Sequence, residues 1–250
     1  TTGTYSEYCI LENSVTVGSC AWVVVALPAS KVVSAANNAK VLSVWIRDAA
    51  GNVGARVDTN SVVYDNTLPL VTLLSHTGAD KAYRGGTSST ISWTATDTAL
   101  ATTPISIEYS TNSGSSWTSI VSGIANSGSY AWSVPALNTS TVRIRILATD
   151  LATNVGSATS SQDFSIDQTI PTVTAISLNG GAASTSSNYV QVSLSSTDAH
   201  SKIAQFCLKT SATAPAAGNS CWVSVTANPP NLAYAANFSM PSYTYLIGFA

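Results

Sequence analysis

The sequence contains the same six-residue pattern twice, and this repetition favours tandem copies of one module. The pattern is Tyr64-Asp65-Asn66-Thr67-Leu68-Pro69 at its first occurrence and Ile166-Asp167-Gln168-Thr169-Ile170-Pro171 at its second, so the prolines are 102 positions apart (171 − 69). The same offset relates Asp48 to Asp150. A constant, ungapped offset indicates a module followed by its copy. Because proline ends a strand ladder and stiffens the chain, we interpret each pattern, called a joint below, as a linker.

The joints divide the chain into three expected modules, at residues 1–66, 67–168 and 169–250. Only the middle module has all its expected strands; the first begins at its third strand and the last stops before its final strand. We therefore expect the 250 residues to be a window from a longer array. The alternative is that a neighbouring subunit donates the missing strands.

Alternation of apolar and polar residues, the pattern of strands with one buried face, runs through the middle module. Turn residues such as Gly85-Gly86 and Asn112-Ser113-Gly114 separate the alternating segments. Seven short strands in about 100 residues are typical of an immunoglobulin-like β-sandwich. The expected strands are 69–75, 89–95, 105–110, 116–121, 129–134, 141–148 and 161–166. The sequence therefore predicts an all-β chain of tandem immunoglobulin-like sandwiches, the first and last incomplete.

Composition excludes some partners. Charged residues make up only 9% of the chain, well below the usual quarter, and the formal net charge is −2. Lysines and arginines are scattered singly, which gives no basis for nucleic-acid binding. No apolar run reaches the roughly 20 residues that span a bilayer, and the first residues lack the profile of a signal peptide. We expect neither nucleic acid nor membrane insertion.

The four cysteines form two close pairs, Cys9 with Cys20 and Cys207 with Cys221. Each pair lies on strands expected to be neighbours, so two hairpin disulfides and an oxidising compartment are predicted. Zinc is the other interpretation, but the spacings of 11 (20 − 9) and 14 (221 − 207) contain no Cys-x-x-Cys knuckle. We expect disulfides.

The joints YDNTLPLVTLLS and IDQTIPTVTAIS, with the turns RDAAGNVG and ATDLATNVG, resemble the immunoglobulin-like repeats of large secreted bacterial adhesins and surface fibres. The second turn departs from that pattern, with Thr153 where glycine is usual. The resemblance covers all three modules and implies secretion, tandem arrangement and a stalk or adhesive role. The implied partners are neighbouring modules of the same chain or fibre, and a glycan or protein on a host or prey surface.

No set of residues predicts catalysis, since the two histidines fall in different modules and the acidic residues lie mostly in turns. Three aspartates carry a metal hypothesis. Asp65 in the joint, Asp97 after the second strand and Asp150 before the last strand are expected at one end of the middle sandwich, and calcium prefers several such oxygens. Asp167 and Asp198 would begin the equivalent site at the second joint. The alternative is that each aspartate only closes its own turn.

The tryptophans Trp22, Trp117 and Trp222 follow the cysteine region, or its serine counterpart, in each module. Packing against the hairpin is the expected role, and a sugar-stacking platform is the alternative. The function we expect is a non-catalytic structural or adhesive segment of an extracellular bacterial protein. Two alternatives are a carbohydrate-binding or spacer module of a secreted enzyme, and a filament subunit that assembles by strand exchange.

Overall fold

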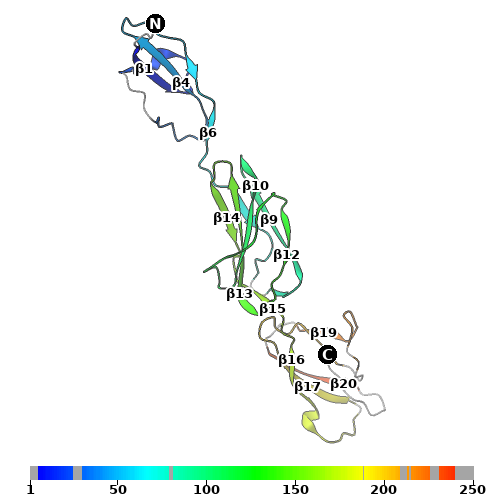
Figure 1. Cartoon of the computed structure of the whole chain (residues 1–250). Coiled ribbons are helices and arrows are strands. Elements are labelled where there is room, and N and C mark those ends of the chain that lie inside the picture. The colour runs from blue at the N-terminus through cyan, green and yellow to red at the C-terminus, as the bar shows by residue number, and fades with distance from the viewer. Residues whose placement is uncertain are drawn as a thin grey trace. The chain divides into compact units, whose positions relative to one another are not determined.

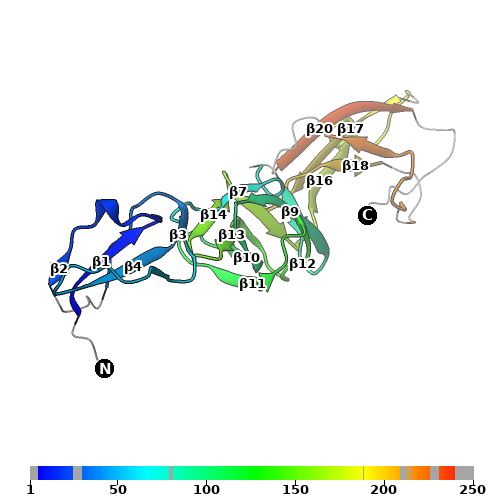
Figure 2. The ribbon, with the colours of Figure 1, turned by 90° about the horizontal axis from the view of Figure 1, so that it is seen from above.

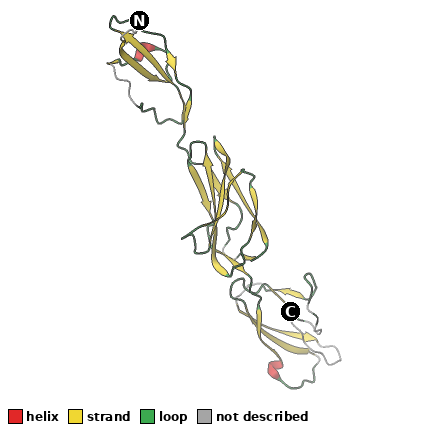
Figure 3. Cartoon of the chain, in the orientation of Figure 1, coloured by secondary structure: helices red, strands yellow, loops and turns green. Residues whose placement is uncertain are grey.

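In the computed structural model the chain consists almost entirely of β-strands, and the only helices among its described residues are two 3-10 turns (Figure 3). The structure describes residues 5–24, 30–78, 81–187, 189–208, 213, 215–225 and 231–239. The prediction of an all-β fold is confirmed. Among these residues no helix is long and apolar enough to cross a bilayer.

Contacts divide the chain into two compact units. The first comprises Thr1–Leu70, Thr96–Ala101 and Thr149–Gly156, and the second comprises Val71–Ala95, Thr102–Ala148 and Ser157–Ala250. Two loops of the middle module, Thr96–Ala101 and Thr149–Gly156, therefore belong to the same compact unit as the first joint. The candidate site described below lies among these three segments. The division into three modules stays a prediction.

The N-terminal strands form two small antiparallel sheets (Figure 1). One has the order β2-β1-β4-β5, and the other pairs β3 with β6. Tyr8, Cys9 and Trp45 are buried, which places the apolar side chains of β1 and β4 in the core of this module. The bounds are β1 (Tyr5–Glu12), η1 (Val17–Ser19), β2 (Val23–Val24), β3 (Asn38–Lys40), β4 (Leu42–Asp48), β5 (Val57–Asp58) and β6 (Val62–Tyr64).

The middle module is a two-sheet sandwich (Figures 1 and 2). One sheet has the order β11-β10-β13-β15-β8, with β14 also paired to β13, and the other has the order β12-β9-β7. Alternate residues of β9 and β13 are buried, as the period-two pattern predicts. The bounds are β7 (Leu70–Leu73), β8 (Ala82–Arg84), β9 (Ser88–Thr96), β10 (Leu100–Ser110), β11 (Thr118–Ile124), β12 (Ser129–Ser133), β13 (Thr139–Asp150), β14 (Val155–Thr159) and β15 (Phe164–Asp167).

All seven strands expected in the middle module are present within a few residues of their predicted bounds, but two strands were not predicted. β8 has only three residues, too few to show alternation, and it pairs with β15 in parallel. β14 includes Gly156, which breaks the apolar pattern and is a poor strand residue. Both strands lie at sheet positions where pairing rather than sequence pattern determines the conformation.

The C-terminal strands form a three-stranded sheet, β16-β17-β20, and a hairpin of β18 with β19. The apolar cluster of Leu194, Ile203 and Phe206 is buried here. The bounds are β16 (Thr172–Leu178), η2 (Asn179–Gly181), β17 (Tyr189–Thr197), β18 (Gln205–Cys207), β19 (Trp222–Ser224) and β20 (Asn231–Ser239). The expected segment 243–250 lies outside the described residues.

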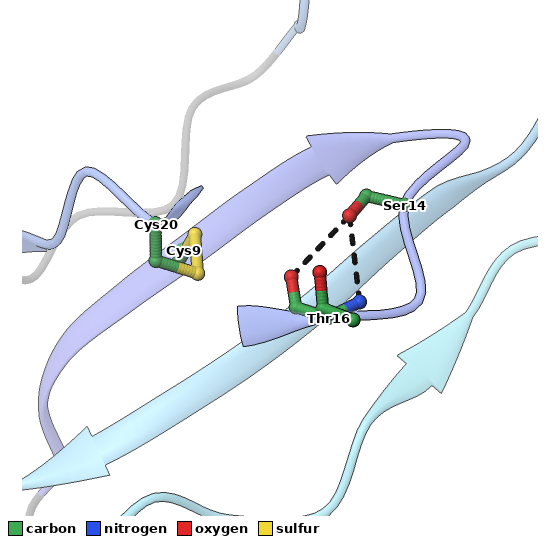
Figure 4. Close-up of a disulfide and its surroundings, with 4 residues drawn as sticks. All are labelled: Cys9, Ser14, Thr16 and Cys20. Atoms are coloured by element: carbon green, nitrogen blue, oxygen red, sulfur yellow. Dashed lines mark hydrogen bonds between the residues drawn. A yellow bond between two sulfur atoms is a disulfide. The ribbon is translucent and has the colours of Figure 1, made fainter. Parts of the chain in front are cut away.

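Both predicted disulfides are present, and the described residues contain no free cysteine. Cys9 on β1 bonds Cys20, with Cα atoms 5.6 Å apart, and a turn between them is closed by the Ser14 hydroxyl, which contacts the backbone of Thr16 (Figure 4). Cys207 bonds Cys221 across the β18–β19 hairpin. A disulfide that closes a loop of this size stabilises the fold by about 3 kcal/mol, because it limits the conformations of the unfolded chain.

A histidine lies in the core of the middle module. His76 is only 3% exposed, its ring stacks on Tyr83 at 4.3 Å, and it also contacts Trp132 and Phe164. Its ring nitrogens are 2.8 Å from the Ser75 hydroxyl and 3.1 Å from the Ser89 hydroxyl. Burial lowers the pKa of His76 from its ordinary 6.5 to about 4. The folded module therefore holds this imidazole neutral.

Acidification is expected to destabilise the middle module through His76. The pKa of His76 is lower in the folded state than in the unfolded state. The contribution of the neutral imidazole to the free energy of unfolding is therefore fully present above pH 6.5 and is lost as the pH falls toward about 4. The loss is about 3 kcal/mol. His76 has a backbone φ of +57°, which asparagine tolerates, so His76→Asn removes the charge change without a new backbone conflict.

The measurement is chemical denaturation followed by tryptophan fluorescence at pH 7 and pH 4. The His76→Asn variant should lose about 3 kcal/mol less than the wild type between these two pH values. Identical pH dependence in the wild type and His76→Asn would show that the buried imidazole does not titrate as described.

Candidate metal centre

The first joint holds Asp65 in a fixed orientation. Its Oδ1 accepts hydrogen bonds from the backbone N–H and the hydroxyl of Thr67, and from the Asn37 amide at 3.3 Å. The Thr67 hydroxyl and N–H lower the pKa of the Asp65 carboxyl, so it carries a negative charge at neutral pH. The Asp-x-Thr element of the joint therefore presents a carboxylate just before β7.

Asp150 ends β13 and closes the turn that leads into β14. Its Oδ1 accepts the N–H of Asn154 and its Oδ2 accepts the Asn154 side-chain amide, both at 2.8 Å. Asp48 and Asn52 form the same turn in the first module, with bonds of 2.8 Å at both positions. Thr153 has a left-handed φ of +69°, and Gly51 at the equivalent position has a left-handed φ of +89°, so threonine keeps the glycine-type turn.

The third carboxylate comes from the loop after β9. Asp97 Oδ1 accepts the backbone N–H of Ala99 at 2.8 Å, which closes a turn. Oxygen atoms of Asp65, Asp97 and Asp150 lie within 4.8 Å of one another. Asp150 is only 2% exposed. Each aspartate therefore closes a turn, and the three carboxylates also converge, while calcium binding stays a prediction.

The cluster is defined as Asp65, Asp97 and Asp150. Within the described ranges, no lysine or arginine forms an ion pair with any of the three. Three like charges that converge in this way repel one another unless a cation lies between them. Chemically, three hard oxygens at one point suit a divalent cation such as calcium.

Backbone packing draws the joint against the turn. The Asn154 amide donates to the carbonyl oxygen of Asp65 at 3.1 Å. A Cβ added to Gly156 would lie only 1.8 Å from the carbonyl oxygen of Pro69. Glycine at 156 is therefore required for the joint to approach β14 this closely. Asn154 and Gly156 thus keep the three aspartates close together, although neither residue belongs to the cluster.

The second joint repeats part of this arrangement. Asp167 ends β15, and its Oδ1 accepts from the backbone N–H and the hydroxyl of Thr169. Asp198 follows β17 and is 6% exposed, against 5% for Asp167. His200 Nδ1 lies 4.0 Å from Asp167 Oδ1. Sequence reasoning named both aspartates and missed the histidine, whose signal was its position three residues after the end of a strand.

The tryptophans near the cysteines have a role that the sequence did not reveal in full. Trp22 stacks on the guanidinium of Arg47 at 4.5 Å, and Trp117 stacks on Arg145 at 4.3 Å. Arg145 also pairs with Glu108 on the neighbouring strand. The two rings are half-buried, whereas Trp45, Trp93 and Trp132 are core residues. Trp22 and Trp117 therefore pack on the sheet through the guanidinium groups of Arg47 and Arg145.

Comparison with known proteins assigns the chain to no family. No family model and no curated protein sequence matches the chain. Fibronectin(III)-like modules of CbhA from Clostridium thermocellum are similar at 16% identity and a TM-score of 0.38, over 66% of this chain and 81% of that one. The FN1–FN3 domains of chicken CNTN1 are similar at 15% identity and a TM-score of 0.32, over 96% and 77%. Neither similarity bears on what this chain binds.

The Gly156→Ala substitution is expected to lower the free energy of unfolding of the middle module by about 1–3 kcal/mol, because the new methyl group would overlap the Pro69 carbonyl. Equilibrium denaturation measures this cost. Gly18→Ala is the matched control: no atom lies within 4 Å of its added Cβ, so its effect should stay within about 0.5 kcal/mol. Equal effects of the two substitutions would contradict the close approach.

Proposed function

We propose that the chain is a non-catalytic, structural or adhesive segment of an extracellular bacterial surface protein or fibre. The observation that carries the proposal is the repeated joint, which is fastened to the module that follows it by the Asn154 amide and by the packing of Gly156 on Pro69. A linker fastened in this way restricts bending between consecutive modules. Restricted bending is what a spacer needs to hold a binding region away from its base.

The two disulfides support an oxidising compartment. They also support a mechanical role, because a disulfide prevents the enclosed loop from being extended. On the sheet surface of the middle module, Arg143 pairs with Asp163 and Arg145 pairs with Glu108. The partners proposed are the neighbouring modules of the same chain or fibre, and a glycan or protein on a host or prey surface.

We further propose that the first joint binds calcium between Asp65, Asp97 and Asp150. The support is geometric: three carboxylates from the joint, the loop after β9 and the turn after β13 converge within 4.8 Å. A cation there would connect three separate segments and offset the repulsion between them. Calcium would then stiffen the joint that the Gly156 contact already positions.

Surface exposure is the direct test of the functional proposal. Antibodies raised against the purified chain should label intact, unpermeabilised cells of the source organism, because the proposal locates the chain outside the cell. The extracellular location would be contradicted if the antibodies labelled only permeabilised cells and the cysteines of the isolated protein were reduced. An antibody against a cytoplasmic protein is the control for cell integrity.

Calcium is expected to raise the thermal midpoint of the chain. At a free concentration 100-fold above the dissociation constant, the stabilisation is about 2.7 kcal/mol. Asp97→Asn should abolish the calcium-induced increase, since the amide keeps an acceptor for the Ala99 N–H but removes a charged ligand.

The matched control is Asp163→Asn, which alters an aspartate paired with Arg143 in the same module. It should leave the calcium-induced increase intact, even if the starting midpoint changes. Differential scanning fluorimetry with calcium and then with chelator measures all three proteins. An equal response of Asp97→Asn and the wild type would exclude calcium binding at this cluster.

A further inference from the structure

The turn that follows β4 in the first module is a copy of the turn that follows β13 in the middle module. The offset of 102 positions (150 − 48) relates Asp48 to Asp150, Asn52 to Asn154 and Gly54 to Gly156. In each turn the aspartate N–H donates to the asparagine carbonyl oxygen, at 3.0 Å in the first module and 3.1 Å in the middle module. The side-chain amide of each asparagine donates to the Oδ2 of its own aspartate at 2.8 Å. The two turns therefore present the same groups to their surroundings.

The first joint covers this surface in the middle module. The Asn154 amide also donates to the carbonyl oxygen of Asp65 at 3.1 Å, and Gly156 faces the carbonyl oxygen of Pro69 so closely that no Cβ fits between them. Asp150 is only 2% exposed, and Gly156 is buried. The joint thus contacts the turn through two backbone carbonyl oxygens, one at each end of its Asp-x-Thr-x-Pro segment.

The corresponding surface of the first module is open. Asp48, Asn52 and Gly54 are all exposed. Within the described residues, Asp48 is the only acceptor of the Asn52 side-chain amide, which leaves the second N–H of that amide without a partner. The atoms nearest to a Cβ added at Gly54 belong to Ile46, with Cγ1 at 3.2 Å, and among the described residues no atom of another segment lies as close. The surface that holds a joint in the middle module is therefore present but uncovered here.

An apolar side chain borders the open turn. Ile46 on β4 is 43% exposed, whereas Ala148, at the same position of the middle module, is fully buried. Covering an exposed aliphatic side chain is favourable because it removes apolar surface from water. Ile46 also leans over Gly54, so an incoming segment must turn its Cδ1 methyl group aside, which an exposed side chain does by a change of rotamer. An unpaired donor and uncovered apolar surface thus lie at one place.

We propose that the turn of the first module, through Asp48, Asn52 and Gly54, binds the Asp-x-Thr-x-Pro joint of another module of the same kind. The Asn52 amide would donate to the carbonyl oxygen of the joint aspartate, and the carbonyl of the joint proline would pack on Gly54. These are the contacts that Asn154 and Gly156 make with the first joint. This inference rests on the proposed role in a fibre of modules, and it specifies the surface to which a neighbouring module attaches.

A joint fits this surface better than an arbitrary extended segment, because its backbone is fixed before it binds. The Asp65 carboxylate holds the Thr67 N–H at 3.0 Å, and Pro69 has a restricted φ. A segment that is already in its bound conformation loses less conformational entropy when it docks. Docking also brings the aspartate of the joint toward Asp48, as Asp65 lies near Asp150 in the first joint. Binding is therefore measured both with calcium and with chelator.

The probe is a synthetic peptide that copies residues 64–73, which contain the first joint and β7, added to the complete, isotope-labelled chain. Two-dimensional NMR follows the backbone amides. The signals of Asn52 and Gly54 should shift and reach saturation in at least one of the two conditions. Those of Asn154 and Gly156 should stay unchanged, because the chain's own joint covers them. A peptide of the same composition in scrambled order should shift none of the four.

Gly54→Ala should weaken the peptide affinity by about tenfold or more, because a methyl group at this position overlaps the carbonyl of the docked proline. Gly54 has no left-handed φ, so alanine keeps the backbone conformation. Gly18→Ala, whose Cβ meets no atom within 4 Å, is the matched control and should bind the peptide like the wild type. Circular dichroism checks the fold of both variants.

Three results would overturn the docking site: no shift at Asn52 and Gly54 in either condition, equal shifts at both turns, or an unchanged peptide affinity in Gly54→Ala. The proposed function is tested separately by antibody labelling of intact cells. Labelled cells together with a peptide that does not bind would leave the extracellular role in place and remove only this docking site.

Discussion

The contact between the Pro69 carbonyl and the backbone of Gly156 is the constraint on which the candidate site depends. A side chain at 156 would leave its Cβ 1.8 Å from that oxygen, so the joint reaches β14 only because glycine is there. The Asn154 amide then fixes the carbonyl of Asp65 at 3.1 Å. With the joint held in place, the carboxylates of Asp65, Asp97 and Asp150 come within 4.8 Å of one another. The motif residues that link consecutive modules are thus also the residues that build a site between segments.

Much of this arrangement could be predicted from the sequence because it follows from repetition and local chemistry. The offset of 102 located the two joints, and the disulfides followed from cysteines on neighbouring strands. Asp-x-Thr and Asp-x-x-x-Asn segments close turns through their own side chains, so the positions of Asp65 and Asp150 were also predictable. Topology alone was enough to bring Asp97 to the same end of the sandwich.

The features that were not predicted depend on contacts between distant segments. β8 has three residues and is a strand only because it pairs with β15 in parallel. The stacking of Trp117 on Arg145 and the burial of His76 against Tyr83 join segments that no local pattern connects. His200 was counted as one of two scattered histidines; only the turn made by Asp198 shows that it faces Asp167. Periodicity identifies strands and their buried faces, but it does not show which polar groups meet across a junction.

We propose that the first joint and two loops of the middle sandwich form one cation-binding unit. The most direct measurement is a crystal structure of the chain grown with calcium, with diffraction data collected at a long wavelength where calcium scatters anomalously. We expect one anomalous peak coordinated by Asp65, Asp97 and Asp150, with the Pro69 carbonyl packed on Gly156. An intact Pro69–Gly156 contact with no peak among the three carboxylates, or a peak elsewhere, would contradict it.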